Sequence, residues 1–384
     1  MPIMSESKHP EFQLADEIIY FNHAAVAPWP ERTRLAVAQF ALQNVRYGAR
    51  DYPEWLQKES LLRKQLQTLI NAPSAQDIAL VKNTSEAISF VAYGLDWQAG
   101  DNIVTSMEEF PSNRIPWESL SNQGVELRQA NLQNEAIPED ALLAQVDNRT
   151  RLLTISSVQF ASGLRLDLNR LGTFCKQNHI LFCVDAIQSL GAIQFDVQAC
   201  QADFVMADGH KWMLGPEGLG VFYSTPEARN RLQLKQFGWH MMKDIHHYEN
   251  HPWEIHPTAR RFECGSPNML GIHALSASLS LLLELGMETV AQRVSDNTQY
   301  LNEKIMASDK LILMSRADKK SASGIVCLQH KTINTPELFY LLQKHNIICA
   351  CRGSNLRLSP HFYNTRNEID NVIKIIEQLA IHPS

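Results

Sequence analysis

Three short apolar runs between residues 180 and 223 limit the fold of this chain more than any other feature. They cover residues 180–184, 204–207 and 219–223, and each is too short for a helix and rich in branched or aromatic side chains. We therefore predict three buried strands of an α/β protein. Asp185 follows the first run, and the polar residues 208–211 follow the second. Because open α/β sheets bind ligands outside their strand ends, we predict a functional site at this edge.

The position of Lys211 beside buried strands has a chemical explanation. A desolvated ammonium is costly unless it is paired or loses its proton, and a lysine amine can condense with an aldehyde. Enzymes that use pyridoxal phosphate (PLP) hold the cofactor in this way and place an acid at its pyridine nitrogen. Asp185 is the candidate acid, and Gln188 would lie near the phenolic oxygen of the ring. The alternative is a surface lysine after an edge strand and an aspartate that only caps a helix.

The order of these motifs resembles a known signature. Residues 185–188 read Asp-Ala-Ile-Gln, residues 209–212 read Gly-His-Lys-Trp, and residues 215–220 form a glycine-rich turn. Together they resemble the class V aminotransferases, a family similar to cysteine desulfurases, kynureninases and isopenicillin N epimerase, which are PLP enzymes of fold type I. The resemblance implies a Schiff base between PLP and Lys211.

The chain length and the element pattern agree with this α/β fold. With 384 residues, two domains or one large α/β domain with a satellite are expected. Alternating strands and helices predict a mostly parallel central sheet. We assign residues 20–255 to a large PLP-binding domain, and residues 1–19 and 256–384 to a smaller α+β domain. The predicted strands outside the first three runs cover residues 18–21, 78–81, 102–105, 125–130, 151–158, 311–314, 325–328, 347–349 and 356–358.

Charge and cysteine usage exclude several classes of partner. The net charge of −6, from 35 basic and 41 acidic residues mixed along the chain, provides no basic face for nucleic acid and no polybasic membrane anchor. The longest apolar stretch, residues 274–286, is too short and too polar to span a bilayer, so we expect a buried helix there. The first residues lack a basic segment followed by a long apolar core, so we expect no secretion signal there. Seven scattered cysteines indicate reduced thiols in the cytoplasm.

Several residues are candidates for holding the cofactor. Thr84 and Ser85 begin a predicted helix, whose free N–H groups would bind a phosphate, although an ordinary helix cap would look the same. The resemblance assigns this pair to the PLP phosphate and Phe110 to stacking on the ring, with a core phenylalanine as the alternative. Desulfurases have a serine in place of Asp208. Because a carboxylate repels phosphate, Asp208 is expected to turn toward His210 or backbone donors, leaving His210 near the phosphate or the lysine.

Other residues are candidates for binding the small-molecule substrate, an amino acid. Arg357 resembles the arginine with which the family binds the substrate carboxylate, and its guanidinium fork suits that group; the alternative is a surface ion pair. His23 is either a substrate contact or a loop histidine bonded to the backbone. Gln159 replaces an asparagine that contacts PLP or substrate in desulfurases. By the same resemblance, Ser266 reaches the phosphate of the neighbouring subunit in a homodimer.

The segment of residues 240–256 is rich in histidine and aromatic residues. Its histidines include His246, His247, His251 and His256, but their spacing matches no familiar metal motif, so no metal is assigned. We expect a loop over the mouth of the pocket.

The reaction is less constrained than the cofactor. In the family, Lys211 would remove the α proton after the substrate displaces it from PLP, and transamination, epimerisation or elimination then follows. A desulfurase also needs a thiolate on a loop before the arginine that binds the substrate carboxylate. Residues 351–357 look too compact to hold such a loop, and Cys351 lies on the strand side. We therefore rank aminotransferase or epimerase-like chemistry above sulfur removal by a cysteine desulfurase or selenocysteine lyase. A nucleotide-binding dehydrogenase is disfavoured, because no GxGxxG motif follows a predicted strand in this sequence. The remaining alternative is a PLP-fold protein that has lost catalysis and serves as a binding module.

Overall fold

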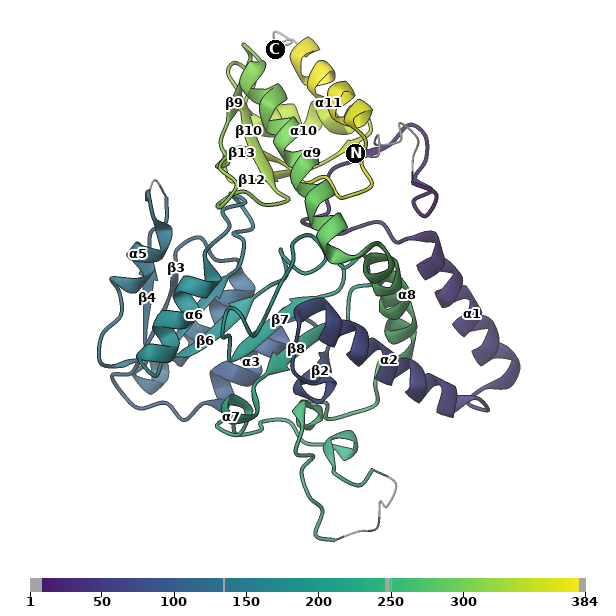
Figure 1. The fold of residues 1–384 in the computed structure, drawn as a ribbon, viewed down its shortest axis with the longest axis vertical. Coiled ribbons are helices and arrows are strands. Elements are labelled where there is room, and N and C mark those ends of the chain that lie inside the picture. Colours follow the sequence, from purple (N-terminus) through teal and green to yellow (C-terminus); the bar gives the residue numbers. More distant parts are fainter. Residues whose placement is uncertain (1–8, 134, 246–248, 250, 380–384) are drawn as a thin grey trace.

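A computed structural model describes residues 9–379 except for residues 134, 246–248 and 250. Figure 1 shows a large sheet with its helices in the lower part of the view and a small sheet with its helices at the top. His246 and His247 lie outside the described residues. The described flanks of the histidine-rich segment are at the bottom of Figure 1, at the opposite end from the small sheet.

The large sheet has seven strands and is mostly parallel, as predicted. Only β8 runs antiparallel to its neighbours, β2 and β7, whereas the remaining pairs are parallel. In spatial order the strands are β2 (Ile78–Val81), β8 (Gly220–Ser224), β7 (Phe204–Asp208), β6 (Leu181–Asp185), β5 (Thr150–Ser156), β3 (Asn102–Ser106) and β4 (Glu126–Ala130).

Helices cover both faces of this sheet, which explains why its central strands are continuous apolar runs. Successive residues of a strand point to opposite faces, so Phe204 packs into one core and Val205 into the other. The first core includes side chains of α3 (Thr84–Gly94). The second core includes side chains of three other helices, α2 (Tyr52–Ile70), α6 (Leu168–Gln177) and α8 (Met269–Leu285).

The small sheet has four antiparallel strands and a core of its own. Its order is β12 (Ala350–Arg352), β13 (Asn355–Leu358), β10 (Val326–His330) and β9 (Leu311–Leu313). A separate pair joins β1 (Ile19–Tyr20) to β11 (Ile347–Ile348), so the start of the chain lies against its C-terminal part. The helices of this part are α9 (Met287–Ala307), α10 (Thr335–Lys344) and α11 (Arg366–Gln378).

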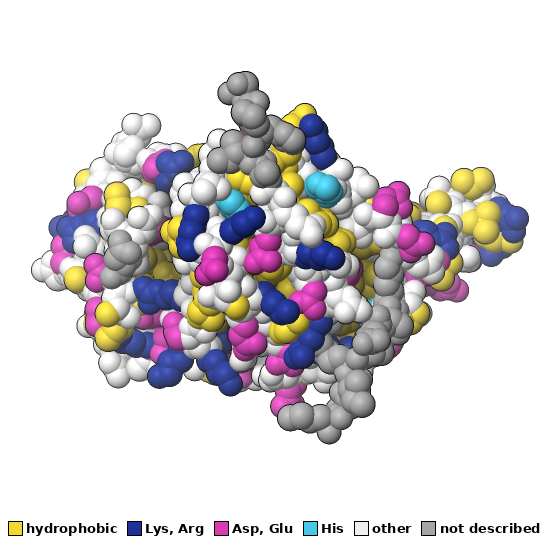
Figure 2. Space-filling model, turned by 90° about the horizontal axis from the view of Figure 1, so that it is seen from above, with side chains coloured by type: hydrophobic (Ala, Val, Ile, Leu, Met, Phe, Trp, Pro, Cys, Tyr) yellow, Lys and Arg dark blue, Asp and Glu magenta, His cyan; other side chains and the backbone are white. Residues whose placement is uncertain are grey.

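Each of the remaining α-helices follows one of the strands along the chain. They are α1 (Glu31–Tyr47), α4 (Ile115–Glu118), α5 (Pro138–Leu143) and α7 (Pro226–Arg229). The buried helix expected at residues 274–286 is the larger part of α8. In the described part of the chain, no single helix has the length and apolarity needed to cross a membrane; α8 and α9 meet those criteria only as a pair, bent by 84°. On the face that Figure 2 shows, basic and acidic side chains are interspersed.

Candidate active site

The two strand ends named by the sequence meet in the centre of the large sheet. Asp185 is the last residue of β6 and Asp208 is the last residue of β7, and these strands pair directly. Lys211 lies in the turn that follows β7. Two backbone bonds close this turn, from Leu214 N to Lys211 O (2.9 Å) and from Gly215 N to Gly209 O (2.8 Å). The turn therefore fixes the lysine beside the carboxyl ends of the strands.

Lys211 has the electrostatics of a reactive amine. Burial lowers its pKa to about 8, and the nearby charges of Arg357 and Arg352 act in the same direction, while Asp185 opposes them. No hydrogen bond or ion pair joins its Nζ to another residue in the part of the chain that the structure describes. Nζ lies 5.6 Å from the centre of the Phe110 ring. A larger fraction of this amine is therefore unprotonated at neutral pH than for an ordinary lysine.

Asp185 is a buried acid with an unusually high pKa. Its side chain is 2% exposed, and burial raises its pKa to about 7, helped by the neighbouring Glu109. The backbone N–H of Ile187 donates to its Oδ1 at 3.0 Å and, with the charge of Lys211, limits this rise. A protonated ring nitrogen at this carboxylate would replace the missing solvation, so the site fits a pyridine ring.

Glu109 is a residue of the site that sequence reasoning missed. It is buried, burial raises its pKa, and it accepts bonds from Ser156 N (2.7 Å), Asn113 Nδ2 (3.0 Å) and Gln159 Nε2 (2.8 Å). These bonds orient the amide of Gln159 and leave its buried Oε1 without a partner among the described residues. Nothing in the local sequence marks Glu109, because two of its partners come from β5 and from the loop after it, and only Asn113, in the 3-10 helix Pro111–Asn113, is near in sequence.

Gln188 is held from two sides. Its Nε2 donates to Ala24 O at 3.1 Å, and its Oε1 accepts from Trp212 Nε1 at 2.8 Å. Trp212 follows the lysine directly in sequence. Gln188 thus ties the loop at residues 22–28 to the turn that carries Lys211, and only the second N–H of its amide remains for a ring oxygen.

His23 lies inside the protein with both ring nitrogens occupied. Nδ1 is 2.8 Å from Ser359 O, and Nε2 is 2.6 Å from the Tyr363 hydroxyl. Burial, together with the neighbouring His361, lowers its pKa well below the usual value. The structure therefore leaves His23 no free polar atom for a substrate, and its contacts are those of the backbone-bonded alternative.

The start of α3 lies beside the end of β7. Asn83, rather than Thr84 or Ser85, caps this helix, because its Oδ1 accepts from Glu86 N at 2.9 Å. Thr84 Oγ1 accepts from Asp208 N at 3.1 Å, and Ser85 Oγ donates to Ser112 Oγ at 2.8 Å. Asn83 was not the predicted cap, but the start of α3 still suits a phosphate, because the first N–H groups of a helix point outward from its start.

Asp208 and His210 face each other, as expected. Asp208 Oδ1 lies 3.0 Å from His210 Nδ1, but neither buried atom forms an aligned hydrogen bond with a described residue. Buried polar atoms without partners are rare in folded proteins. The pair therefore has bonding capacity that a bound group can use.

Arg357 is another buried side chain with polar atoms that have no partner. Its side chain is 1% exposed, and its Nη1 donates to Phe160 O at 2.7 Å. Nε and Nη2 have no partner in the described chain, and burial, helped by Arg352, lowers its pKa to about 10. Arg357 is thus not a surface ion pair. Two parallel N–H groups without acceptors form the fork that a carboxylate fills.

The loop that carries Gln159 and Phe160 packs tightly against the small sheet. Gly163 has a φ of +74°, and a Cβ atom there would lie 2.6 Å from Ile325 O.

Phe110 is 42% exposed. Its ring packs edge-on against the ring of Phe160, with 5.1 Å between the two ring centres. The position of Phe110 beside Lys211, and not in a core, leaves its ring available to a ligand.

Ser266 forms no described contact with these residues in the single chain. It is exposed, between the end of the 3-10 helix Ala259–Phe262 and the start of α8. No hydrogen bond or ion pair joins it to the other candidate residues within the described chain.

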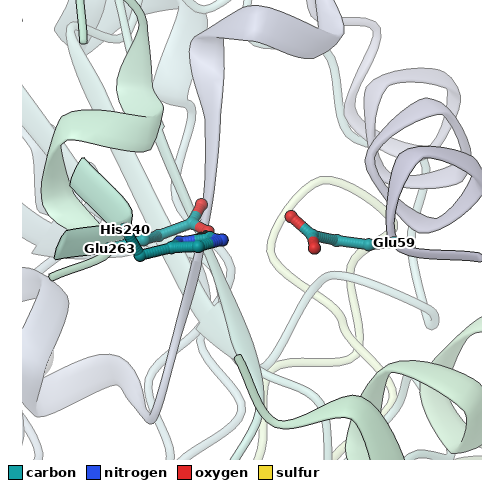
Figure 3. A group of neighbouring side chains, drawn as sticks. All are labelled: Glu59, His240 and Glu263. Carbon is teal, nitrogen blue, oxygen red and sulfur yellow. Dashed lines mark ion pairs between the residues drawn. The ribbon is translucent and has the colours of Figure 1, made fainter. Parts of the chain in front are cut away.

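A second cluster includes a buried residue of α2. Figure 3 shows Glu59, His240 and Glu263 pointing toward one another, and their ligand atoms lie within 4.8 Å of each other. Sequence reasoning did not find it, because the three residues come from distant segments. Arg63 bonds Glu59 (2.6 Å) and both oxygens of Glu263 (2.6 and 2.7 Å), and Arg260 bonds His240 Nε2 (2.9 Å). The two arginines supply the positive charge that a metal ion would bring.

Replacing Arg63 with methionine should lower the free energy of unfolding by about 3 kcal/mol, because two buried carboxylates lose their cation. Urea unfolding followed by circular dichroism measures this change. Arg34→Met is the control, since Arg34 pairs with Glu31 on the surface, and it should leave the unfolding midpoint in place. Stabilisation of the wild-type chain by added Zn²⁺ or Mn²⁺ would contradict the ion-pair interpretation.

Comparisons with known proteins agree with this geometry. The aminotransferase class-V family profile matches residues 19–372. A probable cysteine desulfurase of Methanothermobacter thermautotrophicus is 27% identical over 98% of both chains, and the uncharacterized aminotransferase YcbU of Bacillus subtilis is 26% identical over 88% of both.

Solved structures share the fold. The cysteine desulfurase CsdA of Escherichia coli superposes with a TM-score of 0.84 at 22% identity and covers 94% of both chains. The cystine C-S lyase C-DES, solved with its product cysteine persulfide, superposes with a TM-score of 0.87 at 20% identity over 94% of this chain and 98% of its own. A mutant of C-DES was solved with glycine covalently linked to the PLP cofactor. By its sequence and its architecture, the chain belongs to the aminotransferase class-V family.

Proposed function

We propose that this chain cleaves the carbon–sulfur bond of a cysteine-type amino acid. The sequence alone ranks aminotransferase or epimerase-like chemistry higher, but several relatives similar over most of the chain are named cysteine desulfurases, which favours the alternative. The observation that carries the proposal is the fork of Arg357, which has no acceptor and lies close enough to Lys211 for its charge to act on that amine. An α-amino acid carries its carboxylate and its α proton on the same carbon, so a substrate carboxylate bound by Arg357 would bring the α proton to the side of Lys211.

Pyridoxal 5′-phosphate is the cofactor, and the residues of the site fit it. When bound, it supplies an electron sink that stabilises negative charge on the α carbon of the substrate. Lys211 would hold its aldehyde carbon, Asp185 its ring nitrogen, and the start of α3 its phosphate. The free amine of Lys211 then removes the α proton, while Arg357 fixes the substrate carboxylate.

The placement of the thiols favours one form of carbon–sulfur cleavage. In the β12–β13 ladder, Cys351 is paired with Leu356, whereas Arg357 is paired with Ala350. Adjacent residues of a strand point to opposite faces, so Cys351 points away from the face of Arg357. Only two residues, Gly353 and Ser354, join these strands, which agrees with the compact turn expected from the sequence.

Cys327 shares the face of Arg357 but is not poised as a nucleophile. It is paired with Arg357 across β10 and β13. Its Sγ lies 3.0 Å from Ala161 O, and burial raises its pKa to about 11. A thiol with this pKa is protonated at neutral pH and does not attack sulfur.

We therefore favour a lyase reaction, in which no protein thiol is needed. The α proton moves to Lys211, the Cβ–S bond breaks, and the sulfur leaves with the electron pair and its own substituent. Water then converts the three-carbon remainder to pyruvate and ammonium. A desulfurase instead transfers sulfur to a protein thiol and forms alanine.

The products distinguish these reactions. The PLP-loaded protein is incubated with L-cysteine and with L-cystine, and pyruvate, alanine, persulfide and sulfide are quantified. Pyruvate formed together with persulfide or sulfide supports the lyase reaction, and alanine indicates a desulfurase. A sulfur-containing oxoacid or an inverted amino acid without sulfur release would overturn the proposal in favour of transamination or epimerisation.

Cys351→Ser is expected to leave the rate of pyruvate formation within about twofold of wild type, because its thiol lies on the far face of the strand and surface substitutions have small effects. The measurement is a coupled assay for pyruvate. Alanine is quantified alongside pyruvate, and a tenfold loss of alanine formation in the variant would show that this thiol takes part and would restore the desulfurase mechanism.

We also propose a homodimer in which Ser266 completes the site of the neighbouring subunit. Its exposure in the single chain supports this role. Analytical ultracentrifugation should give a particle of two chains, and Ser266→Ala should release PLP more readily in dialysis. A monomer that retains PLP would contradict the proposal.

A further inference from the structure

We propose that Glu109 is a positioning residue for the cofactor, whose buried negative charge retains the proton that Asp185 shares with the ring nitrogen of PLP. Asp185 would contact the nitrogen directly, and Glu109 would act on the proton through the field of its charge. The inference concerns the cofactor alone. It applies equally to a lyase and to a desulfurase, and so goes beyond the proposed cleavage of a carbon–sulfur bond.

The register of the large sheet places Glu109 next to Asp185. Ser156 and Asp185 are the last residues of β5 and β6, and they are paired directly. Neighbouring strands lie about 4.8 Å apart. The Glu109 carboxylate accepts bonds from both Ser156 N (2.7 Å) and Ser156 Oγ. It is therefore bonded to the residue that lies directly beside the candidate acid.

The contacts of Glu109 are those of an ionised carboxylate. Besides the two bonds from Ser156, it accepts from Gln159 Nε2 at 2.8 Å and from Asn113 Nδ2 at 3.0 Å. The Asn113 amide can only donate here, because its Oδ1 already accepts two other bonds. Two donors therefore face each carboxylate oxygen. Hydrogen bonds to the charged form favour that form, and they oppose the rise in the pKa of Glu109 that its burial causes.

This charge has no cation beside it. Glu109 is 4% exposed, and no ion pair among the described residues includes it, whereas Asp208 lies 3.0 Å from His210. A buried anion without a counter-charge is costly. Burial raises the pKa of Asp185, the charge of Glu109 raises it further, and Lys211 is the cation that lowers it. Because bound PLP takes up the Lys211 amine, a protonated ring nitrogen would provide the counter-charge.

The chemistry makes two opposite demands on protons in this site. Lys211 must lose a proton to act as the base, and burial lowers its pKa only to about 8. The ring must keep a proton at that same pH, because its positive charge makes it an electron sink. Burial, with Glu109 contributing, raises the pKa of Asp185 to about 7, and a basic ring nitrogen adds a second position for the proton. The charge of Glu109 thus allows a free amine and a protonated ring at one pH.

The experiment compares PLP with its deaza analogue, in which a carbon atom replaces the ring nitrogen. Both carry the aldehyde for Lys211 and the phosphate, and only PLP can hold the shared proton. Dissociation constants for the cofactor-free protein are measured at about pH 8, near the pKa of Lys211, from the quenching of tryptophan fluorescence, since Trp212 adjoins Lys211. The wild type should bind PLP about 100-fold more tightly than the analogue, because each of two nearby acids changes a protonation equilibrium about tenfold or more.

Substitution of Glu109 locates the effect. Glu109→Gln should reduce the preference for PLP about tenfold, by weakening PLP and not the analogue. Glu118→Gln is the matched control, since Glu118 is an exposed acid of the same segment, and it should change neither affinity. An unchanged preference in Glu109→Gln, or equal losses for PLP and the analogue, would overturn the inference, because a merely structural role weakens both alike.

Substitutions of Gln159 test the charge while Glu109 stays in place, and so cover the case in which Glu109→Gln does not fold. Gln159→Lys brings a cation to the Glu109 carboxylate and should lower the preference for PLP about tenfold. Gln159→Met has a similar shape without the charge and should keep the preference. A preference that survives in Gln159→Lys, or one that is lost in Gln159→Met, would overturn the inference; the second result would show that Glu109 acts only by orienting Gln159.

The outcome is separable from that of the proposed function. Because affinity is read from protein fluorescence and not from product, a preference for PLP that depends on Glu109 supports the inference even if no carbon–sulfur bond is cleaved. Cleavage of cystine by a protein whose preference does not depend on Glu109 would support the proposed function and refute the role of Glu109.

Discussion

Lys211→Ala is expected to be purified without the visible absorption of lysine-bound PLP and to lose at least about 10³-fold of its activity. Two losses combine, because this amine both anchors the cofactor and acts as the base, and a positioned base alone contributes about 10²–10⁴-fold. The measurements are an absorption spectrum after incubation with PLP and the pyruvate assay with L-cystine. Lys176→Ala, an exposed helix lysine, is the control and should remain yellow and active.

The lowered pKa of Lys211 gives the same residue a pH signature. The unprotonated amine is the nucleophile that captures PLP, and burial lowers its pKa to about 8. The rate of PLP capture by the cofactor-free protein should therefore rise with pH up to about 8 and then level off, whereas an ordinary lysine would show a rise continuing to about 10. A wild-type protein that stays colourless with PLP at every pH would overturn the assignment of the cofactor.

The centre of the site could be predicted because its information is local. Asp185 and Lys211 each follow a run of buried residues, and a strand end followed by polar residues is visible without any knowledge of neighbouring strands. The mostly parallel order of the large sheet followed in the same way from alternating strands and helices. The three-residue strand Ala350–Arg352 could not be found, because it has no periodicity of its own and exists by pairing with β13.

Other parts of the site depend on contacts between distant segments. His23 is 336 residues from Ser359 in sequence, and only the folded chain shows that its ring is fully bonded. Glu109 is an ordinary charged residue in the sequence, and its burial appears only with the register of strands. The ranking of reactions placed sulfur removal second, although relatives are named cysteine desulfurases. A compact turn at residues 351–357 excludes a nucleophilic loop but not sulfur elimination.

Arg357→Gln is expected to weaken substrate binding by about 100-fold while leaving the cofactor spectrum intact. The substitution removes two parallel charge-assisted hydrogen bonds to the α-carboxylate, which together contribute about 3 kcal/mol to binding. The dissociation constant of an unreactive amino acid, read from the cofactor absorption, measures the effect. Arg357→Lys should recover only part of the affinity, because an ammonium cannot form the fork.

Stability separates this role from a structural one. In the substrate-free chain, Arg357 is buried with two unpartnered N–H groups, and its lowered pKa shows that folding disfavours its charge. Removing it should therefore stabilise the fold, by about 1 kcal/mol, and urea unfolding of the substrate-free protein measures this gain. An arginine kept for a structural ion pair would give the opposite sign. A higher free energy of unfolding together with weaker substrate binding is the combination that only a carboxylate-binding residue produces.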